Sequence, residues 1–109
     1  MATITTINNE EIIFSDGSRI SYDHDHDCCE DNYADFEQLD DIARGTDFNT
    51  NDMVFKKADC GFMFGNEPTK MFFVPCYSEQ NGYYTTDVDI YYNGNEVLET
   101  EGKFLYVEY

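Results

Sequence analysis

Residues 23–31 are the part of the chain richest in groups that bind metals or act as nucleophiles. The segment holds both histidines, two of the four cysteines and five carboxylates. His24 and His26 are two residues apart, so they would share one face of a strand, and Cys28 could add a thiolate. Imidazole and thiolate suit zinc and similar transition metals. The segment is therefore a candidate metal site, with zinc or a similar transition metal as the alternative to a protein without a cofactor.

Three other interpretations of the same segment compete with the metal site. The spacing His-x-His-x-Cys differs from structural zinc patterns, so we favour a strand with two half-buried imidazoles followed by a capped helix. A calcium loop is excluded, because Cys28 stands where it needs Gly and Ala34 where it needs Glu. A Cys–His nucleophile is disfavoured, because the surrounding carboxylates oppose a thiolate. We therefore expect a protein that is not an enzyme.

The charge of the chain points to a protein partner with a basic surface. The sequence has 23 acidic and six basic residues, a net charge of −17. Direct binding to nucleic acid or to a membrane surface is disfavoured, because both need a basic patch. A charge of −17 equals that of about 29 Å of B-DNA, so a DNA-like negative face is one form of such an interaction. The candidate partner-binding residues are Asp31, Asp35, Glu37, Asp40 and Asp41.

The elements that must position these groups are expected to be mostly strands. Nine Tyr and nine Phe, with no Trp, suit the faces of a sheet. Asn81-Gly82 and Asn93-Gly94 favour type I′ hairpin turns, and Pro75 indicates an edge or a bulge. The strands are expected at residues 3–7, 10–14, 20–26, 53–58, 61–64, 70–77, 83–92, 96–100 and 103–108.

One amphipathic helix is predicted over about residues 28–44. Apolar residues recur there at steps of three and four, Asp27 and Glu30 form a capping-box pattern, and Gly45 follows the last turn. The predicted fold is therefore α+β. It has a mainly antiparallel, twisted sheet of roughly six to eight strands with this helix packed on it, in a single domain spanning residues 1–109.

The location of the protein is predicted from what the sequence lacks. Residues 1–6 contain neither a basic segment nor an apolar segment typical of a secretory signal. No apolar run approaches the length of about 20 residues that a membrane span needs. We therefore expect a cytoplasmic protein whose four cysteines are free thiols.

Two stretches resemble a family of uncharacterised small proteins from phages and bacteria. The segment His24-x-His26-Asp27-Cys28-Cys29-Glu30 is similar to a His-x-x-Asp-Cys-Cys-Glu segment of that family. Residues 77–85 resemble its Ser-Asn-Gly-Tyr-Tyr-Ser turn, although Gln80 stands where the family usually has Ser. The resemblance covers about residues 10–92. It implies a phage or mobile-element origin and brings no activity with it.

Overall fold

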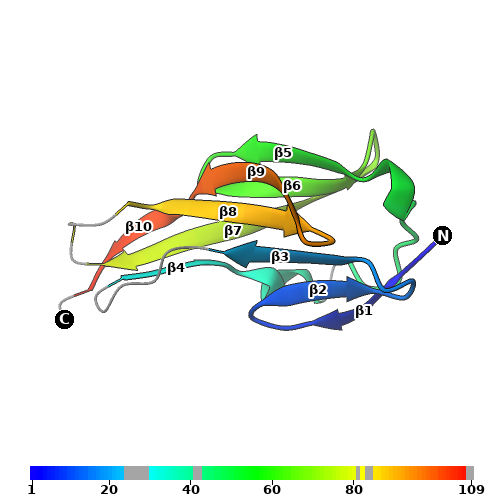
Figure 1. The fold of residues 1–109 in the computed structure, drawn as a ribbon, viewed down its shortest axis with the longest axis horizontal. Helices are drawn as coiled ribbons and strands as arrows, with labels where there is room; N and C mark the ends of the chain where they lie inside the picture. Colours follow the sequence, from blue (N-terminus) through cyan, green and yellow to red (C-terminus); the bar gives the residue numbers. More distant parts are fainter. Residues whose placement is uncertain (24–29, 41–42, 81, 83–84, 108–109) are drawn as a thin grey trace.

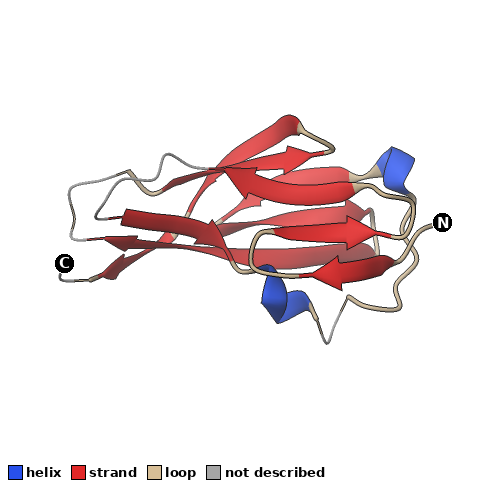
Figure 2. Cartoon of the chain, turned by 60° about the horizontal axis from the view of Figure 1, so that its bottom comes forward, coloured by secondary structure: helices blue, strands red, loops and turns tan. Residues whose placement is uncertain are grey.

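The computed structural model describes residues 1–23, 30–40, 43–80, 82 and 85–107. Within these ranges the chain forms two β-sheets around a shared core, with two single-turn 3₁₀ helices, η1 (Phe36–Leu39) and η2 (Thr50–Asp52) (Figures 1 and 2). The strands are β1 (Ile4–Ile7), β2 (Glu11–Phe14), β3 (Arg19–Asp23), β4 (Glu30–Ala34), β5 (Val54–Ala58), β6 (Gly61–Asn66), β7 (Lys70–Gln80), β8 (Asp87–Tyr92), β9 (Asn95–Glu101) and β10 (Lys103–Tyr106). No helix among the described residues is long and apolar enough to cross a membrane.

The first sheet has the strand order β1-β2-β3-β8-β9, and all of its pairs are antiparallel. Asn93 and Gly94 connect β8 to β9, and both have positive φ angles, of 53° and 85°. Two positive φ angles are what a type I′ turn requires, so the predicted Asn93-Gly94 turn is confirmed. The Asn93 side chain also accepts a hydrogen bond from the Arg19 N–H at 2.9 Å, which fastens this turn to β3.

The second sheet is built around the long strand β7. Its order is β10-β7-β6-β5, and β4 also pairs with β7. The Pro75 carbonyl accepts from the Asp35 N–H at 2.8 Å, whereas the Cys76 N–H donates to the Cys60 carbonyl at 2.9 Å. These two groups of one trans peptide point in opposite directions, so β4 and β6 lie on opposite edges of β7, as Figure 1 shows. Pro75, for which the sequence indicates an edge or a bulge, therefore lies where the pairing of β7 with β6 ends and its pairing with β4 begins.

The core between the sheets is aromatic. Phe48 packs against Phe14, Phe64 and Phe72 with ring centroids 5.5 to 5.9 Å apart. The fully buried apolar side chains come from both sheets, from η1 and, with Phe48, from the segment between η1 and η2. The largest of them are Phe14, Phe36, Phe48, Phe62, Phe64, Ile12, Ile20, Leu39, Ile90, Val74 and Val88. This arrangement agrees with the prediction that Phe and Tyr would cover sheet faces.

The predicted α+β class and the helix over residues 28–44 are wrong. Residues 30–34 form β4, and only residues 36–39 turn, as a single 3₁₀ helix, so the fold is mainly β. The reason lies in what Asn32 contacts. Its buried amide donates to the carbonyls of Thr85 and Asp87 at 2.9 and 3.2 Å and accepts from the Ser78 hydroxyl. These bonds to distant parts of the chain hold the segment extended and override its helical periodicity.

Candidate functional site

A pocket of about 340 Å³ lies where β4 and η1 meet β3, β7 and the β1–β2 turn. Among the described residues that line it are four carboxylates and two tyrosines, and none of these lining residues is Lys, Arg or His. The lining residues are Asn9, Tyr22, Asp31, Tyr33, Ala34, Asp35, Glu37 and Glu79. We call this the acidic pocket.

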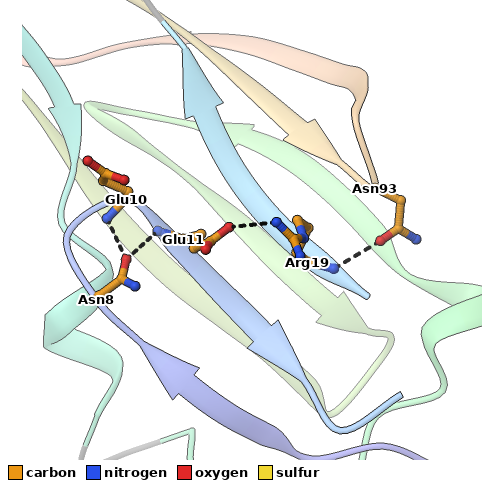
Figure 3. Close-up of polar contacts among 5 residues, drawn as sticks. All are labelled: Asn8, Glu10, Glu11, Arg19 and Asn93. Atoms are coloured by element: carbon orange, nitrogen blue, oxygen red, sulfur yellow. Dashed lines mark hydrogen bonds and ion pairs between the residues drawn. The ribbon is translucent and has the colours of Figure 1, made fainter. Parts of the chain in front are cut away.

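The β1–β2 turn, which supplies Asn9, is held by the side chain of Asn8. Its oxygen accepts from the N–H groups of Glu10 and Glu11 at 2.8 and 2.9 Å, an Asx-type turn that Figure 3 shows. The Tyr22 hydroxyl, on β3, donates to the Asn9 carbonyl at 3.1 Å. These bonds fix one wall of the acidic pocket relative to β3.

The opposite wall is the outward side of β4 and β7. Asp31 lies directly opposite Glu79, and Tyr33 lies directly opposite Tyr77. Because side chains alternate along a strand, Asp31 and Tyr33 share one face, while Asn32 between them points into the core. The ring centroids of Tyr33 and Tyr77 are 5.6 Å apart, so the Tyr77 ring packs against Tyr33 and restricts its movement.

The third wall is the turn from β4 into η1. The Asp35 N–H donates to the Pro75 carbonyl at 2.8 Å, and its carboxylate accepts from the Gln38 amide at 3.2 Å. The buried Phe36 anchors η1 in the core and packs on the Tyr22 ring with centroids 5.9 Å apart. Anchoring on Phe36 leaves Glu37, the next residue, exposed at the pocket.

The electrostatic field of the carboxylates reaches both tyrosines. Burial, and after it the charges of Asp31 and Glu10, raise the pKa of the Tyr22 hydroxyl. Burial, and after it the charges of Glu79 and Asp31, raise the pKa of Tyr33. Both phenols therefore stay protonated at neutral pH, and the acidic pocket is a region of negative potential with two neutral aromatic rings in its wall.

The salt bridges among the described residues lie away from the acidic pocket. Arg19 pairs with Glu11 at 3.4 Å across β2 and β3 (Figure 3), Arg44 pairs with Asp40, and Lys56 pairs with Glu67. None of these residues lines the pocket. Three of the six basic residues are therefore paired with carboxylates that do not line the acidic pocket.

The structure brings together three of the five predicted partner-binding residues. Asp31, Asp35 and Glu37 line the acidic pocket, Asp40 pairs with Arg44 instead, and Asp41 is outside the described residues. Glu79 joins them although it is far away in the sequence. Only the pairing of β4 with β7 reveals its place, and the helical assignment hid that pairing.

Tyr22 and Tyr33 were also not predicted as site residues. The helix predicted over residues 28–44 includes Tyr33, whereas in the structure Tyr33 lies in β4 and lines the acidic pocket. Tyr22 was placed correctly on a strand, because the alternation of residues 20–23 is clear in the sequence. Its role at the pocket depends on the approach of β4, for which the sequence carries no local signal.

The predicted metal site at His24, His26 and Cys28 falls outside the described residues. Among the residues that are described, no group of three or more His, Cys, Asp or Glu side chains is arranged to hold a metal ion. Cys60 and Cys76 are free thiols, as predicted. The zinc hypothesis stays a prediction from the sequence.

A second acidic surface lies on the outward face of the first sheet. Asp89 on β8 stands opposite Asp23 on β3 and opposite Glu99 on β9. The charge of Asp87, then the hydrogen bond that a protonated Glu99 carboxyl shares with Asp89, raise the pKa of Glu99. This surface differs from the acidic pocket, because its carboxylates oppose one another across an extended sheet, whereas those of the acidic pocket line one cavity.

Comparison of the chain with protein-family models, with curated proteins and with solved structures finds no match. The resemblance to a phage and bacterial family therefore stays a prediction.

Proposed function

We propose that this protein is a non-enzymatic binding protein that engages a basic surface of a partner protein through the acidic pocket. The observation that carries the proposal is the convergence of four carboxylates on one pocket, where the described lining residues include no Lys, Arg or His. A concave negative surface attracts cationic groups more strongly than the same charges spread over a convex one, because field lines concentrate in it. The free thiols of Cys60 and Cys76 suit a cytoplasmic partner.

The proposal rests on the position of the carboxylates rather than on the total charge. A net charge of −17 attracts any basic molecule weakly and without orientation. Charges that converge from β4, η1 and β7 define a location and a direction, which specific recognition needs. Neutralising the pocket should therefore matter more than neutralising an equal number of carboxylates elsewhere.

The experiment measures fluorescence anisotropy of a short, labelled peptide of alternating arginine and glycine. The pocket variant carries Asp31→Asn, Glu37→Gln and Glu79→Gln. We expect its dissociation constant to rise at least about tenfold relative to the unmodified protein, a change of about 1.4 kcal/mol. An equivalent peptide with glutamate in place of arginine should not bind either protein.

The matched control removes three carboxylates from the first sheet, through Asp87→Asn, Glu96→Gln and Glu99→Gln. It has the same net charge as the pocket variant, so the total charge predicts equal losses for the two. We expect the control to bind the arginine peptide within about twofold of the unmodified protein. Equal losses in both variants, or no loss in the pocket variant, would overturn the proposal.

A further inference from the structure

We infer that the acidic pocket takes one arginine side chain of the partner, with the tyrosine rings contacting the guanidinium and the carboxylates pairing with it. This inference rests on the proposed function and names the group that is recognised. It is carried by a feature independent of the acidic residues: two aromatic rings, Tyr22 and Tyr33, which belong to different sheets and line the same cavity.

The size of the cavity limits what can enter it. Its volume of about 340 Å³ is near the lower end of the range of roughly 300 to 1,000 Å³ for pockets that hold small ligands. A helix or a paired strand has a cross-section of about 10 Å or more and would not enter. One long side chain fits this space, so the partner is expected to insert a single residue.

The two rings make the acidic pocket selective for a cation with a flat face. Tyrosine rings attract cations through the negative charge of their faces, and a guanidinium also stacks on them. Tyr22 is braced by Phe36 and bonded to the Asn9 carbonyl, and Tyr33 is braced by Tyr77. Because these rings are already held in place, they lose little conformational entropy when a ligand binds, and the binding free energy is more favourable.

The carboxylates favour arginine over lysine. Asp31 and Glu79 are cross-strand neighbours, and such residues have Cβ atoms about 5 Å apart. Two carboxylates at this separation can receive several of the five N–H groups that a guanidinium presents in one plane. A lysine ammonium is a compact and more strongly hydrated charge that cannot span them while lying flat on a ring.

The experiment is an NMR titration of the ¹⁵N-labelled protein with three blocked peptides that differ only in a central residue between glycines. That residue is arginine, lysine or citrulline, which has the shape of arginine without the charge. We expect saturable shifts at residues 31–37 with the arginine peptide and at least about threefold weaker binding of the lysine peptide. The citrulline peptide should leave the spectrum unchanged.

Two variants test the aromatic contribution separately from the charge. Tyr33→Phe keeps the ring, so its affinity for the arginine peptide should stay within about twofold of that of the unmodified protein. Tyr33→Leu removes the ring, so its affinity should fall about tenfold. Unchanged signals from the β8–β9 hairpin show that each variant is folded. Equal binding of the arginine and lysine peptides, or of the Phe and Leu variants, would overturn this inference. In that case pocket-dependent binding of the alternating peptide would still support the proposed function. Loss of that binding as well would overturn both.

Discussion

Asp31 and Glu79 stand directly opposite each other across β4 and β7, on the face that lines the acidic pocket. Like charges in directly opposed positions of a sheet repel each other. A cationic group of a partner that contacts both carboxylates would reduce this repulsion. This relationship links the stability of the protein to its proposed binding and gives the first prediction.

A double-mutant cycle of Asp31→Asn and Glu79→Gln measures the repulsion between the two carboxylates. We expect an unfavourable pair interaction of roughly 0.2 to 1 kcal/mol in the free energy of unfolding, because the cycle separates this repulsion from the other contacts of each side chain. Urea unfolding followed by circular dichroism gives the free energy for each variant. A cycle that gives no unfavourable interaction would contradict repulsion between the two residues.

The acidic surface on the outward face of the first sheet gives a second prediction. The Asp89 Oδ1 atom is buried and has no hydrogen-bond partner among the described residues, and Glu99 lies directly opposite it. The amide of an Asp89→Asn variant can donate to Glu99, so we expect roughly 0.5 to 1 kcal/mol of added stability. A melting temperature that stays the same or falls would show that Asp89 and Glu99 do not lack a hydrogen-bond donor between them.

The raised pKa of Glu99, on the same acidic surface, makes the stability of the protein depend on pH. Its folded-state pKa is raised above the ordinary value of 4.5, so the folded protein binds this proton more tightly than the unfolded chain does. The contribution of Glu99 to stability is therefore largest below pH 4.5 and is lost as the pH rises through the folded-state pKa. Glu99→Gln should flatten the stability profile just above pH 4.5, and an unchanged slope there would contradict the assignment.

The two thiols should differ widely in reactivity. Cys76 is fully buried, and burial together with the nearby Cys60 raises its pKa to about 12. Cys76 therefore stays in the thiol form at neutral pH. In a variant with serine at positions 28 and 29, iodoacetamide should label the partly exposed Cys60 first and Cys76 only after unfolding. Labelling of both at equal rates in the folded protein, measured by mass spectrometry, would argue against the buried position.

The sequence predicted most strands because their signals are local. The Asn93-Gly94 turn and the alternation from Arg19 to Asp23 depend on neighbouring residues only, and both agree with the structure. Residues 30–39 were misassigned because Phe36 and Leu39 are buried at a spacing of three, which suits a 3₁₀ turn as well as an α-helix. What decides between them is the buried bonding of Asn32 to Thr85 and Ser78, which are distant in the chain.

The candidate site was predictable only in part, for the same reason. The acidic character of residues 31–37 is visible in the sequence. Their convergence with Glu79 and Tyr22 depends on β4 lying beside β7 and near β3, and no local pattern encodes that placement. A pocket assembled from four segments therefore follows from the fold rather than from a motif.

A charge exchange tests the central claim most directly. Anisotropy would be measured for labelled arginine–glycine and glutamate–glycine peptides with a variant carrying Asp31→Lys and Glu37→Lys. A control carrying Asp87→Lys and Glu99→Lys has the same net charge. If the acidic pocket recognises the peptide, the affinity of the first variant for the arginine peptide should fall at least about tenfold, and this variant should bind the glutamate peptide. The control should still bind the arginine peptide more tightly than the glutamate peptide. The same change of preference in both variants would contradict the account, because binding would then follow the total charge.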